Sequence, residues 1–200
     1  MNRGTYYRVM ALFLVSGASA LIYQVCWQRL LFESVGVDIE SVTIIVSTFM
    51  LGLGLGALAG GELADRFPDR TLHMFALIEM ATAVFGAGST VLIHAVSRAV
   101  IDAPSAVIAA ANFVLLLCPT LLMGATLPIL VRHVMNLYGN IGESVGILYF
   151  VNTLGAALGA GFTGFVALYY LGLSATIQVA VALNVAVSAA VWFGIRNRHA

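Results

Sequence analysis

Six long apolar stretches constrain this chain more than any other feature. A helix needs about 20 apolar residues to cross the hydrocarbon core of a bilayer. Only 9% of the 200 residues are charged, whereas a soluble domain carries about 25%. The sequence therefore predicts an all-α polytopic membrane protein, with one domain over residues 1–200. The expected transmembrane helices are 9–31, 41–61, 72–95, 105–131, 145–168 and 174–195.

Charge and cysteine content exclude several classes of protein. The formal net charge is zero, so the chain offers no basic surface for nucleic acid. Cys26 and Cys118 lie inside apolar runs without CxxC spacing, and we interpret both as buried hydrophobic residues. The four histidines lie at or near the ends of the expected helices. We therefore expect no metal, no cofactor and no catalytic residue on this chain.

The first apolar stretch could also be a signal peptide. Arg3 and Arg8 precede it, and Ala18-Ser19-Ala20 resembles a cleavage site. The apolar run continues to Leu31, however, which is too long for the core of a signal peptide. We expect this stretch to remain as a membrane helix.

The arginines predict the orientation of the bundle. Positively charged residues favour the cytoplasmic side of a membrane. With both termini in the cytoplasm, only Arg29 and Arg98 face outward. We therefore predict a protein of the bacterial cytoplasmic (inner) membrane, surrounded by lipid. The arginines on its cytoplasmic side would be Arg3, Arg8, Arg66, Arg70, Arg132, Arg196 and Arg198.

Glycines spaced four residues apart mark two of the expected helices. Gly52, Gly56 and Gly60 lie on one face of the second, and Gly155 and Gly159 on one face of the fifth. Such faces let membrane helices pack closely. Matching Gly52 and Gly56 to Gly155 and Gly159 suggests that three helices repeat in inverted orientation. Transporters often place a substrate site between inverted repeats, although two helices rich in small residues also align by chance.

The outer half of the first helix carries an aromatic and amide face. Helical spacing groups Tyr23 with Trp27, and Gln24 with Gln28. Polar groups in lipid must be satisfied, so this face predicts a ligand site inside the bundle. The alternative is an aromatic belt at the membrane surface. Arg29 follows, and the position of Glu33 four residues later allows a salt bridge.

Glu79 is the strongest candidate for function because it is the carboxylate that lies well inside an expected helix. Burying such a group in a membrane is costly. It could bind a cation, carry a proton or hold a helix partner, or it could be a structural residue that faces Asn152. Asn152 precedes the Gly155 and Gly159 face and is a further candidate for ligand binding.

The fourth helix and a charged loop are candidates for conformational change. Pro119 and Pro128 interrupt hydrogen bonding within the fourth helix, which predicts a hinge or a bent wall. The loop 61–70 resembles the cytoplasmic loop of major facilitator transporters. Asp65, Arg66 and Arg70 match its charges, and Gly61 and Leu63 match its other positions. Pro68 and Asp69 depart from the usual glycine and arginine.

Four strings together resemble a narrower family: SGASALIYQVCWQRLL (16–31), FMLGLGLGALAGGELADR (49–66), PTLLMGATLP (119–128) and LYFVNTLGAALGA (148–160). They are similar to the membrane module of fused major-facilitator/spermidine-synthase-like proteins. The resemblance implies six helices like one half of a major facilitator transporter, and a homodimer as the plausible assembly. It also implies a soluble aminopropyltransferase-like domain, which this sequence does not contain.

Two functions follow as alternatives. The first is a transporter-like or solute-binding membrane module for polyamines or related cations. The second is a membrane anchor for a spermidine synthase-like domain or partner.

Overall fold

Six long helices make up most of the molecule. The computed structural model describes residues 3–35, 39–138 and 141–199. Six helices in the described part of the chain are long and apolar enough to cross a membrane, which agrees with the six predicted helices. They are α1 (Arg3–Val35), α2 (Ile39–Arg66), α3 (Thr71–Ala99), α4 (Ser105–Tyr138), α5 (Ile141–Phe162) and α7 (Gly172–His199).

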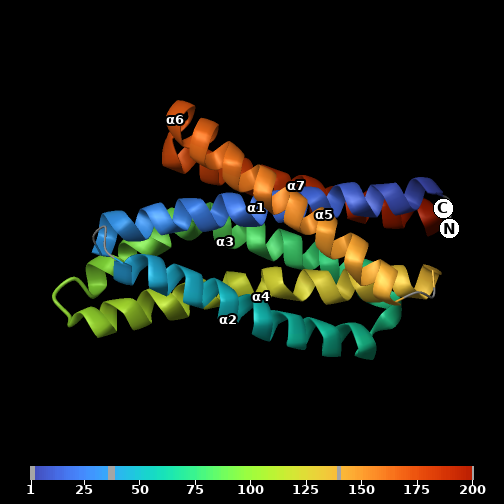
Figure 1. The fold of residues 1–200 in the computed structure, drawn as a ribbon, viewed down its shortest axis with the longest axis horizontal. Coiled ribbons are helices and arrows are strands. Elements are labelled where there is room, and N and C mark those ends of the chain that lie inside the picture. The colour runs from blue at the N-terminus through green and yellow to red at the C-terminus, as the bar shows by residue number, and fades with distance from the viewer. Residues whose placement is uncertain (1–2, 36–38, 139–140, 200) are drawn as a thin grey trace.

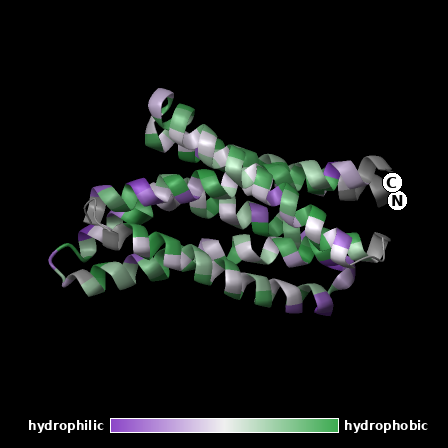
Figure 2. Ribbon diagram, in the orientation of Figure 1, coloured by the Kyte–Doolittle hydropathy of each residue, from purple (hydrophilic) through white to green (hydrophobic). Residues whose placement is uncertain are grey.

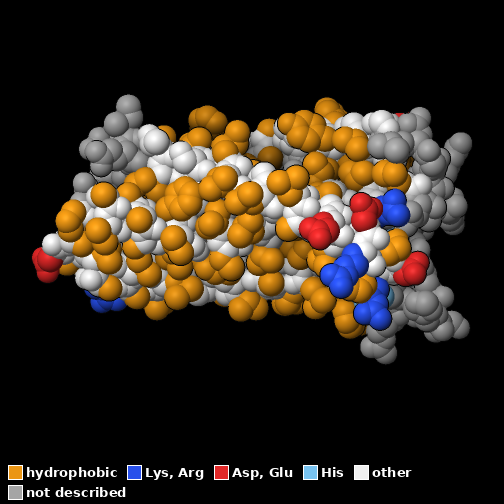
Figure 3. Space-filling view, turned by 90° about the horizontal axis from the view of Figure 1, so that it is seen from below, with side chains coloured by type: hydrophobic (Ala, Val, Ile, Leu, Met, Phe, Trp, Pro, Cys, Tyr) orange, Lys and Arg blue, Asp and Glu red, His pale blue; other side chains and the backbone are white. Residues whose placement is uncertain are grey.

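The helices run side by side and place both termini at one end of the bundle (Figure 1). Hydrophobic residues dominate along most of each helix (Figure 2). In the space-filling view a wide hydrophobic band covers the middle, and charged side chains gather mainly at the end that holds the termini (Figure 3). The distribution is the one expected of a protein whose middle faces lipid.

Two glycine faces set the closest helix contacts. α2 packs mainly against α4, and α1 against α5. A methyl group at Gly56 would overlap the backbone of Leu121, and one at Gly159 would overlap the backbone of Ala18. The glycines therefore allow the two backbones of each pair to touch, as the spacing of small residues requires.

The fifth span departs from the uninterrupted helix expected over 145–168. After α5, a π-helical turn, η2 (Thr163–Ala167), leads to the short helix α6 (Leu168–Tyr170). The Thr163 hydroxyl donates to the Gly159 carbonyl at 2.8 Å. α7 then begins at Gly172, whose φ of 76° suits glycine.

Two apolar clusters fill the core at different depths. The terminal cluster lies toward the termini and includes Phe13 and Phe75. The distal cluster lies toward the other end and includes Trp27 and Phe49. On α3 and α7, polar residues lie between these clusters along the chain, including Glu79 and Asn184, so the core has a polar layer between two apolar ones.

Candidate functional site

All six long helices contribute to one polar cavity, which we call the central chamber. Its volume is about 80 Å³, and about 10–15 Å³ on this scale holds one water. The chamber therefore has room for several water-sized groups. It is lined by Ser16, Gly17, Ser19, Ala20, Leu21, Gln24, Phe49, Leu53, Glu79, Thr82, Met123, Thr126, Asn152 and Asn184.

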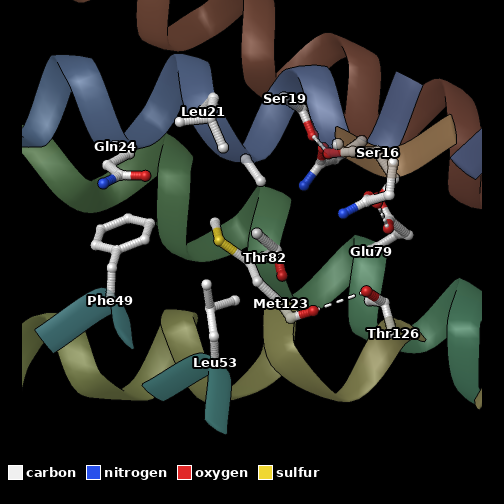
Figure 4. Close-up of a pocket in the computed structure, with 14 residues that line it drawn as sticks. Ser16, Ser19, Leu21, Gln24, Phe49, Leu53, Glu79, Thr82, Met123 and Thr126 are labelled. Atoms are coloured by element: carbon white, nitrogen blue, oxygen red, sulfur yellow. Dashed lines mark hydrogen bonds between the residues drawn. The ribbon is translucent and has the colours of Figure 1, made fainter. Parts of the chain in front are cut away.

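The residues of the chamber follow an elongated path (Figure 4). Ser16 and Glu79 lie at one end, and Gln24 and Phe49 lie at the other. Ser16 and Gln24 are separated by eight residues of α1, which corresponds to about 12 Å along a helix. An extended ligand could therefore touch both ends.

Glu79 provides the carboxyl group of the chamber. Its side chain is 2% exposed, and the Ser16 hydroxyl donates to Oε1 at 2.5 Å. Oε2 is buried and has no hydrogen-bond partner. A buried charge needs a compensating partner. One oxygen of this carboxylate therefore lacks the hydrogen-bond partner or counter-ion that its burial requires.

A second unpaired oxygen comes from α7. Asn184 is 2% exposed, and its Oδ1 is buried without a partner. Asn152 and Gln24 are half-buried on α5 and α1 and line the same chamber. Glu79 and Asn152 thus share a cavity, as their similar depth in the sequence suggested.

Hydroxyl groups complete the lining. The Ser19 hydroxyl donates to the Ser16 carbonyl at 2.8 Å, and the Thr126 hydroxyl donates to the Met123 carbonyl at 2.7 Å. A hydroxyl that donates in this way still has lone pairs that accept. The chamber therefore offers hydroxyl and carbonyl acceptors beside the N–H donors of its amides.

Tyr23 and Trp27 lie outside the chamber, in the distal cluster. Their rings stack at 5.0 Å between centroids, and neither residue is among those that line the cavity. The Tyr23 hydroxyl and the Trp27 Nε1 are buried without partners. Gly86 leaves the space that Tyr23 occupies, because a methyl group there would overlap the phenol. Gln28 is half-buried and also does not line the chamber.

One local expectation is wrong. Cys118 is exposed on α4 rather than buried, whereas Cys26 is buried as expected. Arg29 and Glu33 are both exposed on α1, and the described residues contain no ion pair between them. At an exposed helix end, an ion pair gains little over solvation of its two charges.

The charged loop lies at the end that holds the termini. Asp65 of α2 and Arg132 of α4 pair at 3.5 Å. The Arg66 guanidinium lies 5.7 Å from the centre of the Phe67 ring, and a short 3₁₀ helix, η1 (Pro68–Arg70), carries Arg70 into α3. The role of Asp65, Arg66 and Arg70 in conformational change remains a prediction.

The prolines do not divide α4, which continues from Ser105 to Tyr138 with Pro119 and Pro128 inside it. The Thr120 hydroxyl donates to the carbonyls of Leu116 and Leu117, at 2.9 Å each. A hinge at these prolines also remains a prediction.

Sequence reasoning missed Asn184 and Thr82 as parts of the site. Asn184 is one of several amides within the expected helices, and the residues beside it in the sequence do not distinguish it from the others. Its importance depends on α7 packing against α3, which no local pattern reveals. Within the described part of the chain, no group of three or more His, Cys, Asp or Glu residues could hold a metal ion.

Comparison with known proteins gives two distant relatives. The polyamine aminopropyltransferase of Oceanobacillus iheyensis is 24% identical over 181 residues, which cover 90% of this chain and 34% of that protein. Polyamine aminopropyltransferase 2 of Streptomyces coelicolor is 25% identical over 198 residues, which cover 95% of this chain and 34% of that protein.

The chain thus spans about a third of the length of these curated relatives. No family model matches the sequence. No solved structure matches it either. The comparisons support a partial relation to spermidine-synthase-like proteins, and the likeness to major facilitator transporters stays a prediction.

Proposed function

We propose that this chain is the membrane module of a polyamine aminopropyltransferase-like system. It anchors a synthase domain or partner at the cytoplasmic face of the membrane. The observation that carries the proposal is the pattern of coverage. Both aminopropyltransferases match almost all of this chain, yet the match covers only 34% of the length of each aminopropyltransferase. The remaining two thirds of such a protein can accommodate the catalytic domain.

The charged end of the bundle supports a cytoplasmic docking role. The loop that follows α2 carries or adjoins the charged residues Asp65, Arg66, Asp69, Arg70 and Arg132. Both termini lie at this same end (Figure 1). A synthase domain or partner could be linked to either terminus without crossing the membrane.

The test measures where aminopropyltransferase activity resides in the source organism. We expect the activity to sediment with the membranes of the wild type and to be lost from that fraction when the gene region for residues 1–200 is deleted in frame. The same deletion complemented with the intact gene is the control. Activity that stays wholly soluble in the wild type would rule out the anchor.

A second candidate function is transporter-like handling of polyamines, and the central chamber favours it. The chamber combines one carboxylate with amides and hydroxyls, which suits an amine with several hydrogen-bond donors. In this reading six helices supply half of a transporter, and we propose that a second copy completes a homodimer.

The helix contacts also support an inverted repeat. Gly56 meets Leu121 on α4, and Gly155 meets Leu14 on α1. Likewise, Gly60 meets Ala125, and Gly159 meets Ala18. Adding 99 to the α2 numbers gives the α5 numbers, and adding 107 to the α1 numbers gives the α4 numbers. This match pairs Gly56, not Gly52, with Gly155.

The second candidate predicts polyamine binding by the purified protein in detergent. A ligand at 100 times its dissociation constant stabilises a fold by about 2.7 kcal/mol. We expect putrescine, spermidine or spermine to raise the melting temperature of the wild type but not of Glu79→Gln. A flat response from two folded proteins would leave the anchor as the better function.

A further inference from the structure

We propose that the central chamber binds one compact monovalent cation, either an alkali ion or a primary ammonium group, between Glu79 Oε2 and Asn184 Oδ1. This inference does not rest on transport, because a cation could also stabilise a module that only anchors an enzyme. It names a site and the two atoms that would bind the ligand, neither of which the relatives' names contain.

The two unpaired atoms are both acceptors. Glu79 and Asn184 are each 2% exposed, and Oε2 and Oδ1 have no partner. Leaving a buried polar group unsatisfied costs about 1–3 kcal/mol, and more for a charged group. A ligand that satisfies both must therefore present hydrogen-bond donors or a positive charge.

When Glu79 is ionised, charge balance favours a cation over water. A water molecule could donate to both oxygens, but it would leave the charge of an ionised Glu79 without a counter-ion. Glu79 is the only ionisable residue among the described residues that line the chamber. A single monovalent cation matches that single carboxylate.

The size and lining of the chamber suit a compact ion. Its volume of about 80 Å³ admits an alkali ion with water, or an ammonium head with a few methylene groups. Hard cations bind carboxylate, carbonyl and hydroxyl oxygens. Such oxygens are available from Ser16, Ser19, Thr82, Thr126, Asn152 and Gln24.

The apolar clusters restrict a bound cation to the polar layer between them. The terminal cluster, with Phe13 and Phe75, and the distal cluster, with Trp27 and Phe49, lie on either side of the polar layer. A charge is expensive in such surroundings. The cation would therefore be held where the acceptors are.

The experiment measures thermal unfolding of the purified protein in detergent at constant chloride. Sodium, potassium, lithium, ammonium and methylammonium each replace choline, which is bulky and has no N–H donor. We expect at least one compact cation to raise the melting temperature in proportion to the logarithm of its concentration. A response to alkali ions alone assigns a metal-ion site, and a response to ammonium and methylammonium alone assigns an amine site.

Matched variants locate the effect. Glu79→Gln and Asn184→Ala should weaken the apparent affinity at least tenfold. Asn112→Ala should leave it unchanged, because Asn112 is another buried amide with an unpaired Oδ1 but does not line the chamber. The proposal fails if the folded wild type responds to no cation, or if Glu79→Gln responds as the wild type does.

Discussion

Gly54 and Gly56 show how position on a helix decides the role of a single residue. Both belong to the glycine-rich part of α2. A methyl group at Gly56 would overlap the carbonyl of Leu121, whereas one at Gly54 would meet nothing within 4 Å. Gly56 is therefore required by packing, and Gly54 is not.

Alanine substitutions should separate these two residues. Gly56→Ala forces α2 away from α4, and overpacking of this kind costs about 1–3 kcal/mol. Gly54→Ala meets no neighbour and should leave stability within about 1 kcal/mol of the wild type, the scale of the helix propensity difference. Melting temperatures of the two purified variants test this. Equal losses would contradict the close contact between α2 and α4.

The candidate site could be predicted only in part. Glu79, Gln24 and Asn152 were identifiable because polar groups inside apolar stretches are costly, and the structure brings all three to one chamber. Tyr23 and Trp27 share a helix with Gln24 but enter the distal cluster instead. A helical pattern predicts which residues share a face, and not which neighbour that face meets.

The long helices were the most predictable elements. Length and hydropathy alone show that a stretch such as 72–95 could span a bilayer, and α3 contains it. The π-helical turn η2 was not predictable, because it depends on how local backbone hydrogen bonds shift near Thr163. Hydropathy does not register such a shift, since the residues remain apolar.

Contacts between helices could not be predicted from the sequence, for a different reason. The Ser188 hydroxyl of α7 donates to the Ala76 carbonyl of α3 at 2.8 Å. These residues are far apart in the chain, and each would be an ordinary small residue in isolation. The same packing of α7 on α3 brings Asn184 to the chamber that Glu79 also lines.

The whole molecule has a polarity that arginine placement predicts. Arg66, Arg70 and Arg132 lie at the end that holds both termini, and Arg29 and Arg98 lie toward the other. We expect the first end to be cytoplasmic, following the preference of positive charge.

Reporter fusions test this orientation. Alkaline phosphatase, which is active only outside the cytoplasm, should be inactive after Ala200 and active when inserted after Ala103, in the connection between α3 and α4. A green fluorescent protein at the same two positions is the matched control and should show the opposite pattern. Active phosphatase after Ala200 would reverse the topology.

The depth of Glu79 has an electrical consequence. It lies eight residues along α3 from Thr71, about 12 Å at the rise of a helix, within a hydrocarbon core of about 30 Å. Moving a unit charge across the full membrane is worth about 2.3 kcal/mol per 100 mV. A cation that enters the chamber would cross part of that field, on the order of 1 kcal/mol per 100 mV. Occupancy of the chamber by such a cation would then depend on the voltage across the cell membrane.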